Sequence, residues 1–148
     1  MAVTIRDVAA GDRTAWDDLY AGYAAFYRVD QTAAMRDAVW GWLMDPAHET
    51  CGLVACDEAG AVIGLAHYRA FARPLSASTG GFLDDLFVAP AARGSGAADA
   101  LIAQLRRIGA ARGWTVIRWI TAADNARARA VYDRVAAATP WVTYDIRL

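Results

Sequence analysis

The first third of the chain alternates apolar and polar positions with the period of a strand and then, twice, with the period of a helix. Residues 3–8 (VTIRDV) alternate as a half-buried strand does. The next apolar residues recur every three or four positions and predict a helix with one aromatic face: Trp16, Leu19, Tyr20, Tyr23 and Phe26 or Tyr27. A second helix is expected over Gln31–Asp45, with an apolar stripe of Met35, Val39, Trp42 and Leu43, ended by Asp45-Pro46.

Three strands are expected in succession in the middle of the chain. The apolar runs 51–57 (CGLVACD), 61–71 (AVIGLAHYRAF) and 80–88 (GGFLDDLFV) are separated by the short turn EAG and the loop RPLSAST. Strands joined by such short connections pair antiparallel, so we expect a meander.

The last third returns to helical spacing after Pro90. One helix has the stripe Ala98, Leu101, Ile102, Leu105 and Ile108 and should end at Gly113. A strand (114–121), a helix with Ala128, Val131, Tyr132 and Val135 on one side, and a closing strand (140–148, PWVTYDIRL) follow. The order βααβββαβαβ predicts a single α+β domain over residues 1–148, a mixed, mostly antiparallel sheet of about six to seven strands flanked by four helices.

Composition narrows the class of protein. With 57% apolar and 21% charged residues the chain should fold compactly, and no apolar run approaches the roughly 20 residues of a membrane span. Charges at Arg6 and Asp7 argue against a secretory signal, so we expect a soluble, cytoplasmic protein. Cys51 and Cys56 are expected to be reduced core residues. The net charge of −1 disfavours a nucleic-acid partner.

The stretch Arg93-Gly94-Ser95-Gly96 lies where a strand ends and a helix begins. Unpaired backbone N–H groups converge at such a point, beside the positive end of the helix dipole, and can hold a phosphate. A P-loop would need a Lys, and the chain has none. A dinucleotide fingerprint would need a third glycine where Asp99 stands, and a βαβ unit in place of the meander.

A second motif follows 32 residues after the first. Arg93-x-x-Gly96-x-Ala98 after one strand and Asn125-x-x-Ala128-x-x-x-Tyr132 after the next together resemble the GNAT superfamily of N-acetyltransferases, in the branch of small-amine, amino-acid and histone-type enzymes. The resemblance covers about Val3 to Leu148. It implies an acetyl-CoA-dependent N-acetyltransferase that acts without a metal.

The resemblance also implies a coenzyme site. Two central parallel strands, carrying Phe87-Val88 and Trp119-Ile120, would splay apart, and main-chain groups of Phe87 and Val88 would pair with the pantetheine arm. Amides from Arg93 to Ala98 would hold the pyrophosphate, while Asn125 would contact the arm. The implied coenzyme-binding residues are Leu86, Phe87, Val88, Arg93, Gly94, Ser95, Gly96, Ala97, Ala98, Asn125 and Tyr132.

The chemistry adds two catalytic candidates. An amine with a pKa near 10.4 must lose a proton before it attacks a thioester. By the resemblance Asp84 is the preferred base, with Asp85, His67 or water as alternatives, and strand alternation would send Asp84 and Asp85 to opposite faces. Tyr132 would protonate the leaving thiolate, and the amide of Phe87 or Val88 would stabilise the oxyanion. Since neither cysteine lies near a motif, we expect direct attack in a ternary complex.

The sequence defines the amine acceptor and the protein partners less closely than the coenzyme site. Trp16, Tyr20, Tyr23, Phe26, Tyr27 and Trp40 could form a cation–π box for an amine, although such a stripe is more often core. Polyamine, amino acid, aminoglycoside and protein lysine all stay open as acceptors. The resemblance implies pairing through C-terminal strands, so Trp141, Val142 and Tyr144 suggest a homodimer. The alternative function is a non-catalytic acyl-CoA-binding or sensor module.

Overall fold

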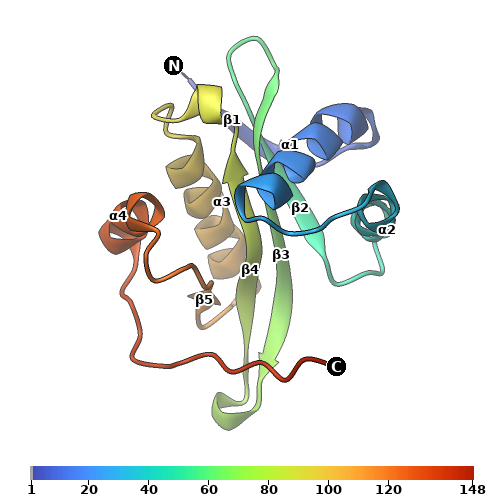
Figure 1. The fold of residues 1–148 in the computed structure, drawn as a ribbon. Coiled ribbons are helices and arrows are strands. Elements are labelled where there is room, and N and C mark those ends of the chain that lie inside the picture. Colours follow the sequence, from blue (N-terminus) through green and yellow to red (C-terminus); the bar gives the residue numbers. More distant parts are fainter. Residues whose placement is uncertain (1) are drawn as a thin grey trace.

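One five-stranded mixed sheet organises the chain (Figure 1). The computed structural model describes residues 2–148. The strands follow chain order across the sheet: β1 (Thr4–Asp7), β2 (Cys51–Cys56), β3 (Val62–Arg73), β4 (Ser78–Val88) and β5 (Ile117–Arg118). The first four pair antiparallel, whereas β5 runs parallel to β4. The predicted meander is therefore confirmed.

The helices cover both faces of this sheet, as expected. They are α1 (Arg13–Phe26), α2 (Ala33–Met44), α3 (Ala97–Arg112) and α4 (Ala126–Val135), with 3₁₀ turns at Ala10–Asp12, Pro74–Ser76 and Pro90–Ala92. Leu65 and Phe87 pack under Trp16 of α1, while Ala66 and Leu83 belong to the core cluster that contains Leu101 of α3. None of the helices described is long and apolar enough to cross a membrane.

The apolar faces of the first two helices agree with the sequence in α1 and only partly in α2. Trp16 is 1% exposed, and Leu19, Tyr20 and Tyr23 pack around the same cluster. In α2, Val39 and Leu43 pack as predicted and Trp40 joins them, but Met35 and Trp42 are 48% and 44% exposed. The buried stripe of α2 is thus rotated toward Trp40 relative to the predicted one.

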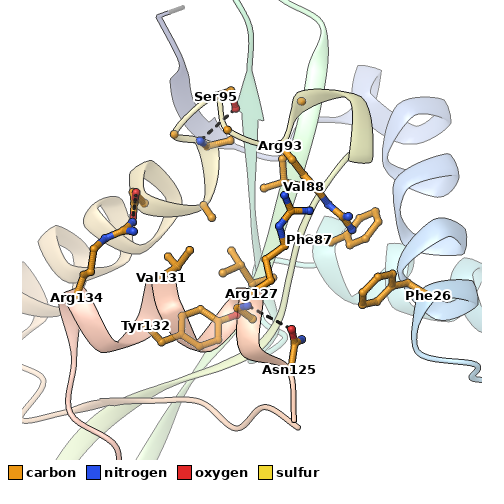
Figure 2. A pocket seen from close by; sticks show the side chains of 18 of the residues that line it. Phe26, Phe87, Val88, Arg93, Ser95, Asn125, Arg127, Val131, Tyr132 and Arg134 are labelled. Atoms are coloured by element: carbon orange, nitrogen blue, oxygen red, sulfur yellow. Dashed lines mark hydrogen bonds and ion pairs between the residues drawn. The ribbon is translucent and has the colours of Figure 1, made fainter. Parts of the chain in front are cut away.

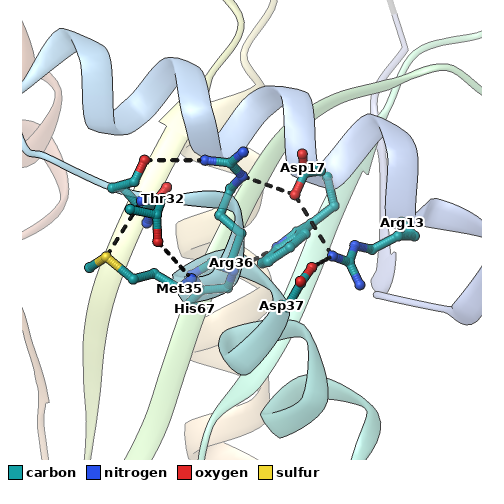
Figure 3. A network of polar contacts seen from close by, with 9 residues as sticks. Arg13, Asp17, Thr32, Met35, Arg36, Asp37 and His67 are labelled. Atoms are coloured by element: carbon teal, nitrogen blue, oxygen red, sulfur yellow. Dashed lines mark hydrogen bonds and ion pairs between the residues drawn. The ribbon is translucent and has the colours of Figure 1, made fainter.

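A polar network fixes α2 against α1 (Figure 3). Asp17 of α1 accepts a hydrogen bond of 2.9 Å from Arg36 Nε of α2. Arg13 of α1 pairs in turn with Asp37 of α2. Thr32 caps the start of α2 by accepting from the amide of Met35 at 3.1 Å. These contacts hold the two helices over one half of the sheet face.

The end of the chain departs from the prediction. Of the expected strand 114–121, Ile117 and Arg118 form β5, and Thr115 and Val116 add main-chain hydrogen bonds to β4. The predicted strand 140–148 does not form, so the sheet has five strands instead of six to seven. Trp141, Val142 and Tyr144 are 80%, 72% and 90% exposed. The segment is extended and apolar, but β5 is too short to offer it an edge within one chain.

A bulge in β4 changes the direction of the two central acids. His67 lies opposite Asp85 and Tyr68 opposite Leu83, so Asp84 is an extra residue without a partner on β3. Both carboxylates consequently bond to the same side of β3: Asp85 to His67 and Asp84 to Arg69. The expectation that they point to opposite faces is wrong, because it assumed an unbroken alternation.

Candidate active site

A cavity of about 480 Å³ opens between the end of β4, the start of α3 and one side of α4 (Figure 2). Leu86, Phe87 and Val88 of β4 form one wall, and Ala128, Val131 and Tyr132 of α4 form another. Every residue that the sequence analysis assigned to coenzyme binding lines this cavity: Leu86, Phe87, Val88, Arg93, Gly94, Ser95, Gly96, Ala97, Ala98, Asn125 and Tyr132. The fold therefore brings the two motifs together.

The turn before α3 presents free main-chain donors to the cavity. Gly94 and Gly96 have φ of +82° and +85°, a left-handed conformation that favours glycine. The amide of Ser95 bonds to Ala92 and that of Ala97 to the Ser95 hydroxyl, whereas those of Gly94 and Gly96 have no acceptor within residues 2–148. Amides in the first turn of α3 also lack helical acceptors. The turn can thus receive an anion.

Arginine side chains surround this turn. Arg93 lies over the ring of Phe26, 5.4 Å from its centroid. Figure 2 shows Arg127 of α4 extending toward the end of the cavity where Arg93 lies. Arg134 bonds to Asp99 at 2.9 Å, which joins α4 to α3. Arg127 was not among the residues predicted from the sequence, although its place two residues after Asn125, at the start of the same helix, was a usable signal. The cavity therefore has a cationic end.

The edge of β4 that faces the cavity is unpaired beyond Phe82. β5 ends at Arg118, opposite Phe82, so the strands separate as the resemblance implied. The amide of Ala89 donates to Ile63 on β3, and alternation along the antiparallel ladder then directs the main chain of Phe87 to β3 as well. Leu86 and Val88 point their main-chain groups into the gap. The predicted use of Phe87's amide does not fit this register.

The start of α4 positions the second motif. The side chain of Asn125 accepts from the amide of Ala128 at 3.2 Å and caps the helix, while its Nδ2 donates to the Tyr27 hydroxyl at 3.3 Å. The Tyr132 ring meets Trp119 edge-on with centroids 5.4 Å apart. Burial raises the pKa of Tyr132 above its usual value, so its phenol stays protonated at neutral pH.

A second cavity of about 330 Å³ adjoins the first. Tyr27, Leu86 and Tyr132 line both, so the two spaces meet at these three residues. The second is otherwise lined by Tyr23, Leu83, Asp84, Trp119, Ile120, Thr121 and Ala122. Of these described residues Asp84 alone is charged. Two compartments that meet at the side chains of two tyrosines, with a carboxylate in the smaller one, suit a reaction between two substrates.

Asp84 lies at the edge of this second cavity. Its Oδ2 accepts from Arg69 Nε at 3.1 Å, and its side chain is 34% exposed. Burial raises the pKa of Asp84 above its ordinary value, and the adjacent Arg69 opposes that rise without cancelling it. A carboxylate with a raised pKa accepts a proton more readily, which suits a general base.

Asp85 and His67 are instead parts of a buried network. Trp16 Nε1 donates to His67 Nε2 at 2.9 Å, so that nitrogen is unprotonated and Nδ1 donates to Asp85 at 2.8 Å. Tyr20 also donates to Asp85, at 2.9 Å. Burial alone would raise the pKa of Asp85, but the hydrogen bond from His67 and the others together hold it below its usual value. Both His67 nitrogens are engaged and the side chain is 2% exposed.

The aromatic residues of the first helices divide between core and cavities. Trp16 and Trp40 pack in the core with ring centroids 5.0 Å apart, as the alternative to a cation–π box expected. Tyr20 contributes its hydroxyl to Asp85. Tyr23 and Tyr27 line the second cavity, and Phe26 and Tyr27 line the first.

Comparison with known proteins agrees with this architecture. Residues 16–137 match the model of the acetyltransferase (GNAT) family. The D-amino-acid N-acetyltransferase HPA3 of Saccharomyces cerevisiae is 27% identical over 143 residues, which cover 96% of this chain and 89% of that protein.

Solved structures show the same fold. A ribosomal-protein-alanine N-acetyltransferase from Brucella melitensis has a TM-score of 0.83 at 25% identity, with both chains covered completely. An aminoglycoside acetyltransferase from an uncultured soil sample, solved with sisomicin, has a TM-score of 0.82 at 15% identity, with 99% of this chain and 96% of that one covered, a likeness of fold alone. Because the family model spans most of the sequence, the chain belongs to the GNAT family and is an acetyltransferase.

Proposed function

We propose that the protein transfers the acetyl group of acetyl-CoA to a primary amine by direct attack in a ternary complex. One observation carries this proposal: two cavities, one with a cationic end and one with a carboxylate, meet at Tyr132. Both substrates can then be held at once, and no nucleophilic side chain of the protein has to carry the acetyl group between them.

The larger cavity fits the donor. Free amides at Gly94 and Gly96, together with Arg93 and Arg127, would hold the pyrophosphate. The gap-facing main chain of Val88 and Leu86 would pair with the amides of the pantetheine arm, and Asn125 would border the arm from α4. These contacts would bring the thioester to the junction of the cavities, since Leu86 and Tyr132 line both.

The smaller cavity would hold the amine. Asp84 attracts the ammonium form and takes its proton, directly or through water, which leaves the nitrogen lone pair free to attack the thioester carbon. The leaving thiolate then gains a proton from the Tyr132 phenol. The register excludes the amide of Phe87 as the donor to the oxyanion and leaves those of Leu86 and Val88. Of these two we favour Leu86, because it lines both cavities. The buried Asp85–His67–Tyr20 network would keep β4 and α1 fixed under this site.

The relatives support an amine acceptor without defining one. They are named for acetylation of a D-amino acid, of an alanine of a ribosomal protein and of an aminoglycoside. All three acceptors carry amino groups.

Two assays test the proposed function. Acetyl-CoA at about 100 times its Kd should stabilise the protein by about 2.7 kcal/mol in a thermal-shift experiment, with little effect of NAD or ATP. Release of free thiol from acetyl-CoA should then depend on an added amine. Stabilisation by a nucleotide alone would contradict the proposal. Stabilisation by acetyl-CoA with no thiol release across a panel of amines would identify a non-catalytic acyl-CoA-binding module.

A Gly96→Ala variant should weaken the donor site selectively. A methyl group at Gly96 would meet nothing within 4 Å, so its cost arises from the backbone, where φ is +85°. Holding a non-glycine residue there costs about 1–2 kcal/mol, and relaxation of the turn would move the free amides. We expect a modest loss of stability and a clear loss of acetyl-CoA affinity by calorimetry. Gly11→Ala, also in open space but without positive φ, is the matched control. If Gly96→Ala bound acetyl-CoA as tightly as the wild type does, the role of the turn would be contradicted.

We also propose a homodimer that pairs through residues 141–148. Tyr144 and Ile146 are 90% and 89% exposed in the single chain, and a second copy would cover them. Sedimentation at micromolar concentration should show a dimer. Tyr144→Asp should dissociate it without lowering the stability of the monomer, because the side chain makes no buried contact. A monomeric wild-type protein would refute the pairing.

A further inference from the structure

A row of three side chains crosses the sheet just beyond the region that α1 covers. Arg69 of β3 lies opposite Phe82 of β4, and Phe82 lies opposite Arg118 of β5, so all three side chains point to one face. It is the face of Leu65 and His67, which Trp16 covers. Figure 1 shows the β3–β4 hairpin extending well past α1 and α2. The row therefore lies on the part of that face that α1 and α2 do not cover.

The two arginines of this row are fixed by aromatic rings. Arg69 lies over Phe82, 4.9 Å from its centroid, and Arg118 lies over Phe71 at 5.6 Å. The two rings meet edge-on with centroids 6.1 Å apart, so they form one platform. Arg118 forms no ion pair within residues 2–148, and Arg69 shares its guanidinium with Asp84 through Nε and one terminal nitrogen. Donors on both guanidinium groups are free for an anion.

The platform adjoins the acceptor cavity. Asp84 lines that cavity and bonds to Arg69, and Arg118 follows on the far side of Phe82 in the same row. A ligand whose ammonium reaches Asp84 therefore has Arg69 beside it and Arg118 one strand further. The protein thus places a positive and a negative group side by side, and this arrangement is complementary to the two charges of a zwitterion.

We propose that the acceptor is a free α-amino acid, whose carboxylate binds Arg69 and Arg118 while its amino group lies at Asp84. This inference rests on the proposed function. The carboxylate and the amine of an α-amino acid are one carbon apart, which matches neighbouring Arg69 and Asp84. A planar carboxylate also suits the fork of a guanidinium. Asp84 would repel an anion of higher charge, such as a phosphate, at the same place.

The test compares acceptors that differ at the carboxyl group alone. Leucine, leucinamide and 3-methylbutylamine share one side chain, and thiol release gives kcat/KM for each. We expect leucine to be preferred over both analogues by at least about tenfold, as the loss of a charge-assisted hydrogen bond predicts. Arg118→Gln should remove most of that preference by raising KM for leucine, while kcat/KM for 3-methylbutylamine stays unchanged.

Arg112→Gln is the matched control. Arg112 lies over Trp114 at 5.6 Å, as Arg118 lies over Phe71, but Trp114 packs in the core cluster of the α3 face. The leucine preference should survive this change. Arg69→Gln should also remove the preference. It should in addition move the pH dependence to higher pH for all three acceptors, because Arg69 lowers the pKa of Asp84.

The outcomes separate this inference from the proposed function. If 3-methylbutylamine and leucinamide have the same kcat/KM as leucine, the inference is wrong and the acetyltransferase reaction stands. The same holds if Arg118→Gln lowers kcat/KM equally for all three acceptors. A dipeptide such as Leu-Gly that outperforms leucine would also overturn it, in favour of a peptide terminus. A change in sedimentation of Arg118→Gln with an intact leucine preference would reassign the platform to a carboxylate of a second copy. If acetyl-CoA is cleaved with none of these acceptors nor with any other amine, the proposed function itself fails.

Discussion

Asp84→Asn is expected to lower kcat/KM for the amine by about 10²-fold at pH 7, within the range of general base catalysis. Asp84 is the one carboxylate, among the described residues, that lines the acceptor cavity. The substitution keeps the size of the side chain and removes its ability to accept a proton. Arg69 loses its partner, but both groups are about one-third exposed, and such a pair stabilises a protein by less than about 1 kcal/mol. The loss of activity should therefore occur in a folded protein.

The pH dependence gives the sharper test. Asp84 acts as a base when it is ionised, so the rate of the wild-type protein should fall as the pH drops through the pKa of Asp84. Burial raises that pKa, which places this fall at a higher pH than for an ordinary aspartate. In Asp84→Asn the fall at the pKa of Asp84 disappears, and the rate should instead rise with the fraction of unprotonated amine, up to the pKa of the acceptor amine, which is near 10.4 for an amine like that of lysine. The profile of the variant thus shifts to higher pH.

Two further variants identify the group responsible. Asp84→Glu keeps a carboxylate and should recover part of the activity. Asp18→Asn, on the exposed side of α1 and without an ion pair in residues 2–148, should behave as the wild type. An unshifted profile in Asp84→Asn would move the role of base to water or to Asp85, whose low pKa and bonds to His67 and Tyr20 make it the poorer acceptor.

Local patterns in the sequence predicted most of the elements because local rules determine them. The apolar stripe through Leu101 and Leu105 predicted α3. Gly113, with φ of +73°, ends this helix as expected. Asn125 and Tyr132 could be assigned to one cavity from their spacing in a helix, once the preceding motif was found. Both motifs lie at junctions of a strand and a helix, where the chain itself determines which groups come together.

Features that depend on distant partners could not be predicted in this way. The bulge at Asp84 depends on how β3 pairs with β4, and it reversed the expected direction of one carboxylate. The same register, and no local pattern, determines that Leu86 and Val88 face the gap. The predicted last strand does not form, because residues 140–148 have the pattern of a strand but β5 is too short to pair with them in a single chain. The Arg69–Phe82–Arg118 row is likewise invisible until three strands are aligned.

Tyr132→Phe is expected to lower kcat by at least about tenfold with acetyl-CoA saturating, the smaller end of general acid effects. The hydroxyl lies where the two cavities meet, and burial keeps it protonated because it raises the pKa of Tyr132. The ring that packs against Trp119 is retained, so the fold and the affinity for acetyl-CoA should be preserved. Tyr68→Phe, which removes a buried hydroxyl on the α3 face away from both cavities, is the control and should keep full kcat.

The choice of leaving group separates an acid role for Tyr132 from a role in positioning. A thiolate with a pKa near 8.5 gains from a proton as it departs, whereas the thiolate of 4-nitrothiophenol is a far weaker base and gains little. We therefore expect the effect of Tyr132→Phe on kcat/KM to be large with acetyl-CoA and small with the acetyl thioester of 4-nitrothiophenol. Equal losses with both donors would show that the hydroxyl orients the thioester instead of protonating it. Unchanged kcat with acetyl-CoA would remove Tyr132 from the reaction.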